Sequence, residues 1–255
     1  MSTRAIVPVK LSLTEGDFYT LWAPKWRQNG SEWQAFLGDD EAVLAFNSPA
    51  ELLCFVESGT KHDLLDHPQW DQFAGRDADR VTPAKRDEYD LIGMPEALAG
   101  RPSHQNVSTV ARNLEMASAL ADVAGAEHTT IFFASHSILR NVSRGADHYS
   151  GEQGMSEWSG VGHVIAGNWK KVIEDLDEHV RVVSSDDFDA AKVSDAKERI
   201  SSAAAASAAA AKEAEEKRKA AAEAADPYDN SPWAAAGIDP IKITAQSKSV
   251  YTCLL

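Results

Sequence analysis

The chain has 255 residues, of which 44% are hydrophobic, and its formal net charge at pH 7 is −14. This length and hydrophobic fraction allow one large or two small folded domains and exclude a disordered chain. The negative charge repels the phosphate backbone, which disfavours direct nucleic-acid binding. The densest basic run, Lys217–Lys219, does not change this, because acidic residues precede it: Glu213, Glu215 and Glu216.

Cysteine usage and hydropathy indicate the compartment. The two cysteines, Cys54 and Cys253, each lie among apolar residues, which is typical of buried, reduced thiols. The N-terminus has no apolar segment of the kind found in a signal peptide, and no run approaches the roughly 18 apolar residues of a membrane span. We therefore expect a cytoplasmic protein without a membrane anchor.

The first 74 residues predict a small sheet with a helix. Ile6–Trp22 carries the clearest hairpin pattern, with period-two alternation before a turn at Thr14–Asp17 and a β-branched and aromatic segment after it. After a loop containing Pro24, Trp33–Leu37 reads as a third strand and Ala42–Phe46 as a fourth. The expected module, residues 1–74, is thus a four-stranded antiparallel sheet covered by helix on one face.

The helix of this module has a distinct start. Ser48 is the expected N-cap, Pro49 occupies the first helical position and Glu51 completes a capping box. Gly59 ends the helix. A short helix carrying Trp70 and Phe73 should follow, with Asp66 as its N-cap.

The remaining chain is predicted to be mainly helical. Residues 75–102 form a connection, and residues 103–185 a helical domain with a long apolar stripe from Met155 to Val180. Three glycines interrupt this stripe, and we expect them to allow a neighbouring helix to approach: Gly160, Gly162 and Gly167. Residues 186–227 form an Ala/Glu/Lys-rich helical spacer, in which Ile200 has little to pack against.

The opening hairpin has a second, weaker copy in residues 228–255. Ile238–Leu254 aligns without gaps to Ile6–Trp22, so that Lys242 corresponds to Lys10 and Tyr251 to Tyr19. The copy stops before its return strand is complete. We therefore expect the chain to be the front part of a longer protein with tandem modules. The fold class is α+β.

Four segments carry a family resemblance. They are Leu11–Asp17 (LSLTEGD), Thr20–Arg27 (TLWAPKWR), Trp33–Gly38 (WQAFLG) and Asp63–Trp70 (DLLDHPQW). Together they resemble an actinobacterial family of cytoplasmic proteins with the transferred label "primosomal protein". The resemblance is tightest over residues 5–75 and resumes at Trp233. It implies continuation into a second sheet unit and a replication-associated accessory role, and it brings no catalytic residues.

Two segments resemble catalytic or phosphate-binding motifs, but each lacks residues that its motif requires. The glycine spacing of 160–167 is that of a phosphate loop, but Asn168 and Trp169 stand where Lys and Ser or Thr are needed. Ser156 lies in an incomplete nucleophile elbow, because Trp158 replaces its last glycine. We expect no cofactor and no catalytic residue.

His62 and His67 form the only tight histidine and aspartate group. A metal or acid–base site there would need a third ligand from Asp39–Glu41, and the two histidines are not on one helical face. Solvent-facing histidines beside a capping Asp66 are the simpler interpretation. A small-ligand or metal-dependent enzyme domain using His62–His67 remains as an alternative function.

Most of the tryptophans should lie in the core, but Trp26 stands in a polar loop between Lys25 and Arg27. An aromatic residue beside arginine is typical of binding hot spots. We therefore predict that Lys25, Trp26 and Arg27 contact a protein partner. The sequence favours a non-enzymatic interaction or scaffold protein built from duplicated modules, with the replication-associated role as an alternative.

Overall fold

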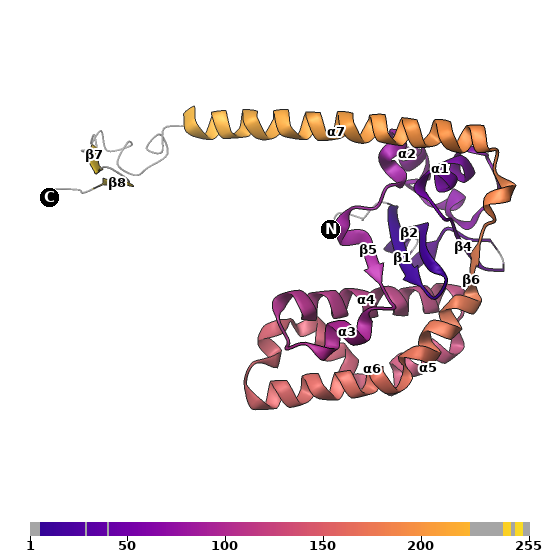
Figure 1. Cartoon of the computed structure of the whole chain (residues 1–255), viewed down its shortest axis with the longest axis horizontal. Helices are drawn as coiled ribbons and strands as arrows, with labels where there is room; N and C mark the ends of the chain where they lie inside the picture. Colours follow the sequence, from indigo (N-terminus) through magenta and orange to yellow (C-terminus); the bar gives the residue numbers. More distant parts are fainter. Residues whose placement is uncertain (1–5, 29, 40, 225–241, 246–247, 252–255) are drawn as a thin grey trace. The chain divides into compact units, whose positions relative to one another are not determined.

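A computed structural model describes residues 6–28, 30–39, 41–224, 242–245 and 248–251, and it centres on a four-stranded sheet (Figure 1). The strand order is β3-β2-β1-β5. The strands are β1 (Val7–Leu13), β2 (Gly16–Gln28), β3 (Ser31–Phe36) and β5 (Glu88–Asp90). The α+β class is confirmed, with a mostly antiparallel sheet followed by helices.

The predicted hairpin forms as β1 and β2. Leu13 pairs with Gly16, which leaves a two-residue turn, and Gly16 has a φ of +144°, a conformation that glycine adopts without strain. Lys10 donates to Asp17 across the hairpin at 3.0 Å. The alternation of the sequence appears as alternating burial along β1, because the two faces of the sheet meet different layers of helix.

The fourth strand of the sheet differs from the prediction. β4 (Val43–Ala45) falls inside the expected Ala42–Phe46 strand, but it pairs in parallel with β6 (Val180–Val182) in a separate two-stranded sheet. The fourth position is taken by β5, which lies parallel to β1 and comes from the expected connection. Three residues are too short to show a period-two pattern, so the sequence did not mark β5 as a strand.

One face of the sheet packs against the helices that follow it in the chain. This face carries Leu11, Phe18 and Trp22, which share a core with Leu120 and Trp169. The indole of Trp169 donates to the Leu91 carbonyl at 2.7 Å, which satisfies its polar atom inside the core. The helices of this layer are α3 (Met94–Ala99), α4 (His104–Ala124), α5 (Glu127–Ser135), η4 (Ser137–Arg144), η5 (Ala146–Tyr149) and α6 (Gly151–His179).

The opposite face is covered by the short helices of the N-terminal segment. They are α1 (Pro49–Glu57), η1 (Asp63–Asp66), α2 (Trp70–Ala74) and η2 (Ala78–Val81). A further turn, η3 (Lys85–Asp87), leads into β5. The Ser48 side chain caps α1 by accepting from the Glu51 amide, while the Glu51 carboxylate accepts from the Asn47 amide. The prediction that Asp66 caps the helix of Trp70 is wrong, because Asp66 is the last residue of η1 and Gln69 is the residue that precedes α2.

The predicted spacer is helical but not wholly solvated. After η6 (Ser185–Asp187), α7 runs from Ala190 to Ala224. Its beginning packs through Val193, Ala196 and Ile200 on the core that covers the second face of the sheet. The expectation that Ile200 has little to pack against is therefore wrong. Arg199 forms two hydrogen bonds with the Glu57 carboxylate, both at 2.8 Å, and these join α7 to α1.

The chain divides into two units, residues 1–203 and 204–255. In the first unit, residues of the expected module 1–74 and of the expected helical domain 103–185 share one hydrophobic core. In the second, β7 (Lys242–Ala245) and β8 (Lys248–Tyr251) form an antiparallel pair. Most of the remaining expected copy, including residues 228–241, lies outside the described residues.

The glycines of α6 have different surroundings. A Cβ added at Gly160 would lie 3.1 Å from the Ile138 side chain, so this glycine does allow a close approach. Gly162 and Gly167 have no neighbouring atom within 4 Å of such a Cβ. The predicted packing role therefore holds for Gly160 alone among these three.

Candidate functional site

Lys25, Trp26 and Arg27 lie on strand β2, not in a loop as predicted. β2 continues to Gln28, and its pairing with β3 shifts register between Ala23 and Trp26. Such a bulge re-aims the side chains of the bulged strand. Pro24, which favoured a loop in the sequence, sits within this irregular stretch, where proline is tolerated in a sheet.

The three side chains have unequal exposure. Trp26 is half-buried, and its ring lies edge-on to the His67 ring with centroids 4.5 Å apart. Lys25 and Arg27 are exposed, and the Lys25 ammonium lies 4.0 Å from the Glu32 carboxylate on β3. Trp26 is therefore a packed residue whose neighbours on the strand carry charge into solvent.

Trp33 is the aromatic residue that sequence reasoning missed. It pairs with Trp26 across β2 and β3, and 55% of its surface is exposed. Leu65, on the adjacent η1, is 42% exposed. We call Lys25, Trp26, Arg27, Trp33 and Leu65 the β3 edge patch. The tryptophans were expected mostly in the core, and only the position of Trp33 on an edge strand signals otherwise.

His62 and His67 are buried, which contradicts the prediction that they face solvent. Their exposed fractions are 6% and 5%. Each packs against a tryptophan. The ring centroids of His62 and Trp70 are 4.4 Å apart, and those of His67 and Trp26 are 4.5 Å apart. The two histidines therefore form an apolar cluster with Trp70, which is near them in sequence, and Trp26, which is distant.

Burial lowers the pKa of both His62 and His67, because an apolar surrounding disfavours the charged imidazolium. The His67 Nδ1 accepts from the Gln69 amide at 3.1 Å, which leaves the proton on Nε2. Within the described residues, neither that Nε2 nor the His62 Nδ1 has a hydrogen-bond partner. Burial thus favours the neutral form of both rings, and packing fixes them.

The carboxylates proposed as further ligands have another partner. Arg181, on β6, bonds to the Asp39 and Glu41 side chains, the latter at 3.2 Å. Asp40 lies outside the described residues. Among those described, no group of three His, Cys, Asp or Glu side chains is arranged to hold a metal ion.

The described cavities lie away from the two histidines. Four surface cavities have volumes of about 650, 610, 560 and 540 Å³, and neither His62 nor His67 lines any of these four. The cavity of about 650 Å³ lies between η4 and α6. No helix in the described parts of the chain has the length and apolar character needed to cross a membrane.

Comparison with known proteins identifies the family. The sequence model of the SatS C-terminal domain matches residues 6–177, about two thirds of the chain. The chain belongs to the SatS C-terminal domain family. The SatS match begins at the start of the sheet and ends within α6, so it includes the β3 edge patch and both histidines.

A solved structure is also similar to the chain. It is described as the crystal structure of the SatS C-terminal domain in complex with bromine. The two chains are 16% identical and align with a TM-score of 0.48 over 70% of this chain and 94% of that one. No match was found among curated proteins.

Proposed function

We propose that this member of the SatS C-terminal domain family is a non-enzymatic cytoplasmic interaction protein that binds an extended segment of a partner protein along strand β3. The observation that carries the proposal is the exposure of Trp33 on that strand. Large aromatic side chains are costly to leave in water, and exposed tryptophans are enriched at binding hot spots.

The position of β3 supports an extended occupant. β3 is the last strand of the four-stranded sheet, so within the described residues one of its edges faces no further strand. The unpaired backbone groups of an edge strand offer hydrogen bonds to an added strand, and flanking side chains select its sequence. Trp33 would provide the apolar contact.

The charges of the β3 edge patch favour one kind of partner. Lys25 and Arg27 are exposed on the face of β2 opposite the paired tryptophans, where Glu32 of β3 lies across from Arg27 and 4.0 Å from Lys25. A segment with an apolar side chain for Trp33 on one face, and a basic residue beside Glu32 on the other, would complement this edge. Charged residues at such a rim mainly govern the association rate and partner choice.

The duplication extends this proposal to bivalent binding. The pairs Lys242–Tyr251 and Ile243–Val250 of the C-terminal hairpin correspond in register to Lys10–Tyr19 and Leu11–Phe18 of the first hairpin. This agreement supports a second module that begins near residue 238. Two modules on one chain raise affinity for a partner with two segments, because the second contact is intramolecular.

The test combines partner capture with mapping of the bound surface. The wild-type chain and the Trp33→Ala variant are used to purify partners from native cells, and Ile131→Ala serves as a control because Ile131 is also 55% exposed, on α5. The proposal expects a partner that is lost with Trp33→Ala and kept with Ile131→Ala. With the purified partner, hydrogen exchange should slow in Ser31–Phe36.

Two results would overturn the proposal. Retention of every partner by the Trp33→Ala variant would show that the β3 edge patch is not the binding surface. Unchanged exchange in Ser31–Phe36 upon binding would exclude strand addition. Recovery of replisome proteins as the Trp33-dependent partners would identify the interaction as the replication-associated role.

A further inference from the structure

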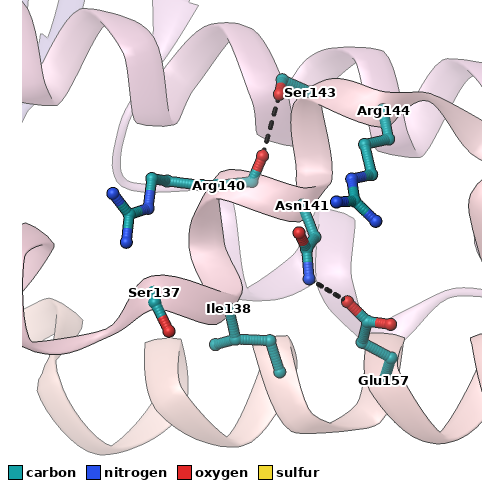
Figure 2. Close-up of a pocket in the computed structure, with 7 residues that line it drawn as sticks. All are labelled: Ser137, Ile138, Arg140, Asn141, Ser143, Arg144 and Glu157. Atoms are coloured by element: carbon teal, nitrogen blue, oxygen red, sulfur yellow. Dashed lines mark hydrogen bonds between the residues drawn. The ribbon is translucent and has the colours of Figure 1, made fainter.

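The cavity between η4 and α6 has the chemistry of an anion-binding pocket. Its volume is about 650 Å³, within the range of small-ligand sites. The lining residues come from one 3₁₀ segment and one helix, as Figure 2 shows. They are Ser137, Ile138, Arg140, Asn141, Ser143, Arg144 and Glu157.

The pocket has an excess of positive charge. Arg140 and Arg144 are exposed, and neither guanidinium forms an ion pair with a side chain in the described part of the chain. Figure 2 shows them on opposite sides of Asn141. Two guanidinium groups without a carboxylate in direct contact keep their charge available to an anion from solution.

The one carboxylate of the pocket is already engaged. Glu157 accepts a hydrogen bond from the Asn141 amide and lies 3.1 Å from the Nε2 atom of His148. These hydrogen bonds, that from His148 first, lower the pKa of Glu157 and keep it ionised. Glu157 therefore fixes Asn141 and His148, and does not neutralise either arginine through a direct contact.

The wall that carries the arginines is held rigidly. Ile138 packs against α6 at Gly160, and Leu139 and Val142, between the polar residues, are buried. Behind the wall, the Tyr149 hydroxyl is buried without a hydrogen-bond partner among the described residues. Burial, followed by the charge of Glu157, raises the pKa of Tyr149 to about 12, so this hydroxyl remains a neutral donor near the pocket.

We propose that this pocket binds a small ligand with two anionic groups, either phosphates or carboxylates, one held by Arg140 and the other by Arg144. A guanidinium binds either group through paired hydrogen bonds. The presence of two arginines at one cavity of about 650 Å³ favours a ligand with two anionic groups over a single phosphate. The inference does not depend on the β3 edge patch, which lies on other elements.

The test uses amide NMR spectra of the ¹⁵N-labelled protein, titrated with pyrophosphate, citrate and inorganic phosphate at constant ionic strength. We expect saturable shifts in Ser137–Arg144 with pyrophosphate or citrate, and at least tenfold weaker binding of inorganic phosphate. Preference between pyrophosphate and citrate then distinguishes a phosphate ligand from a carboxylate ligand.

Variants assign the binding to the pocket. Arg140→Gln and Arg144→Gln should each weaken binding at least tenfold, as expected for the loss of a charged hydrogen-bond donor. Arg101→Gln, at an exposed arginine outside the pocket, should have no effect. All three positions are exposed, and an unchanged spectrum without ligand verifies that each variant folds.

Several outcomes would overturn the proposal. Shifts that do not saturate, or that sodium chloride reproduces at equal ionic strength, would show only general ionic screening. Equal affinity in the two pocket variants and the wild type would place the ligand elsewhere. Equal affinity for inorganic phosphate and pyrophosphate would exclude the use of both arginines by one ligand.

Discussion

Acidification from pH 7.5 to pH 5.5 should destabilise the fold through His62 and His67. Unfolded histidine has a pKa near 6.5, whereas burial lowers the native pKa of both residues. Between these values the unfolded state binds more protons, so the free energy of unfolding falls as the pH falls. Over these two pH units the loss is at most about 1.4 kcal/mol for each histidine.

The assay is urea unfolding at pH 7.5, 6.5 and 5.5. The variant His62→Phe keeps a ring against Trp70, and His67→Asn keeps an acceptor for the Gln69 amide. Together they should remove up to about 2.7 kcal/mol of the pH dependence. The variant His128→Gln is the control, because His128 is exposed on α5.

Loss of carboxylate interactions does not contribute to the change in stability between pH 7.5 and pH 5.5. At Asp39 and Glu57, burial alone would raise the pKa of the carboxyl group. Hydrogen bonds and arginine partners outweigh this effect, so the pKa of each is lowered. Their contribution to stability is present above their unfolded pKa, near 4, and is lost only at lower pH. A stability that stays constant from pH 7.5 to 5.5, or an equal loss in the double variant, would refute the assignment to His62 and His67.

Three further predictions concern stability alone, each measured by urea unfolding. Gly167→Ala should stabilise the protein by up to about 1 kcal/mol, because the added Cβ enters open space on a helix. Gly160→Ala should stabilise less or destabilise, because its Cβ meets Ile138. An equal gain at both positions would contradict the packing at Gly160. Glu57→Ala and Arg199→Ala should each destabilise, with a coupling of about 1 kcal/mol in a double-mutant cycle; additive effects would mean that their ion pair contributes nothing. Ser48→Ala should cost about 1 kcal/mol through loss of the α1 cap, and no change would show that the cap is dispensable.

The local signals in the sequence were sufficient for the first hairpin and for α1. Alternation and a glycine turn define Ile6–Trp22, and a serine, a proline and a glutamate define the start of α1. These patterns depend on residues within a few positions of one another. The same holds for the alanine-rich segment, whose helical propensity is high at every position.

Tertiary contacts decided what the sequence could not show. The burial of His62 and His67 depends on their ring contacts with Trp70 and with Trp26, which is distant in sequence. The exposure of Trp33 depends on its strand being the edge of the sheet, which is a property of the strand order. The arginine pocket escaped notice because Glu157 joins it from a different helix.

The parallel pairing of β4 with β6 has a consequence for how the protein is made. The contact between Glu41 and Arg181 joins positions 140 residues apart, and the beginning of α7 covers the same layer. Contacts of such long range slow folding, because a large loop must close first. During synthesis, β4 leaves the ribosome long before its partner strand exists. We therefore expect the nascent chain to expose this apolar strand until about residue 203 has emerged, a period in which it can associate with other proteins.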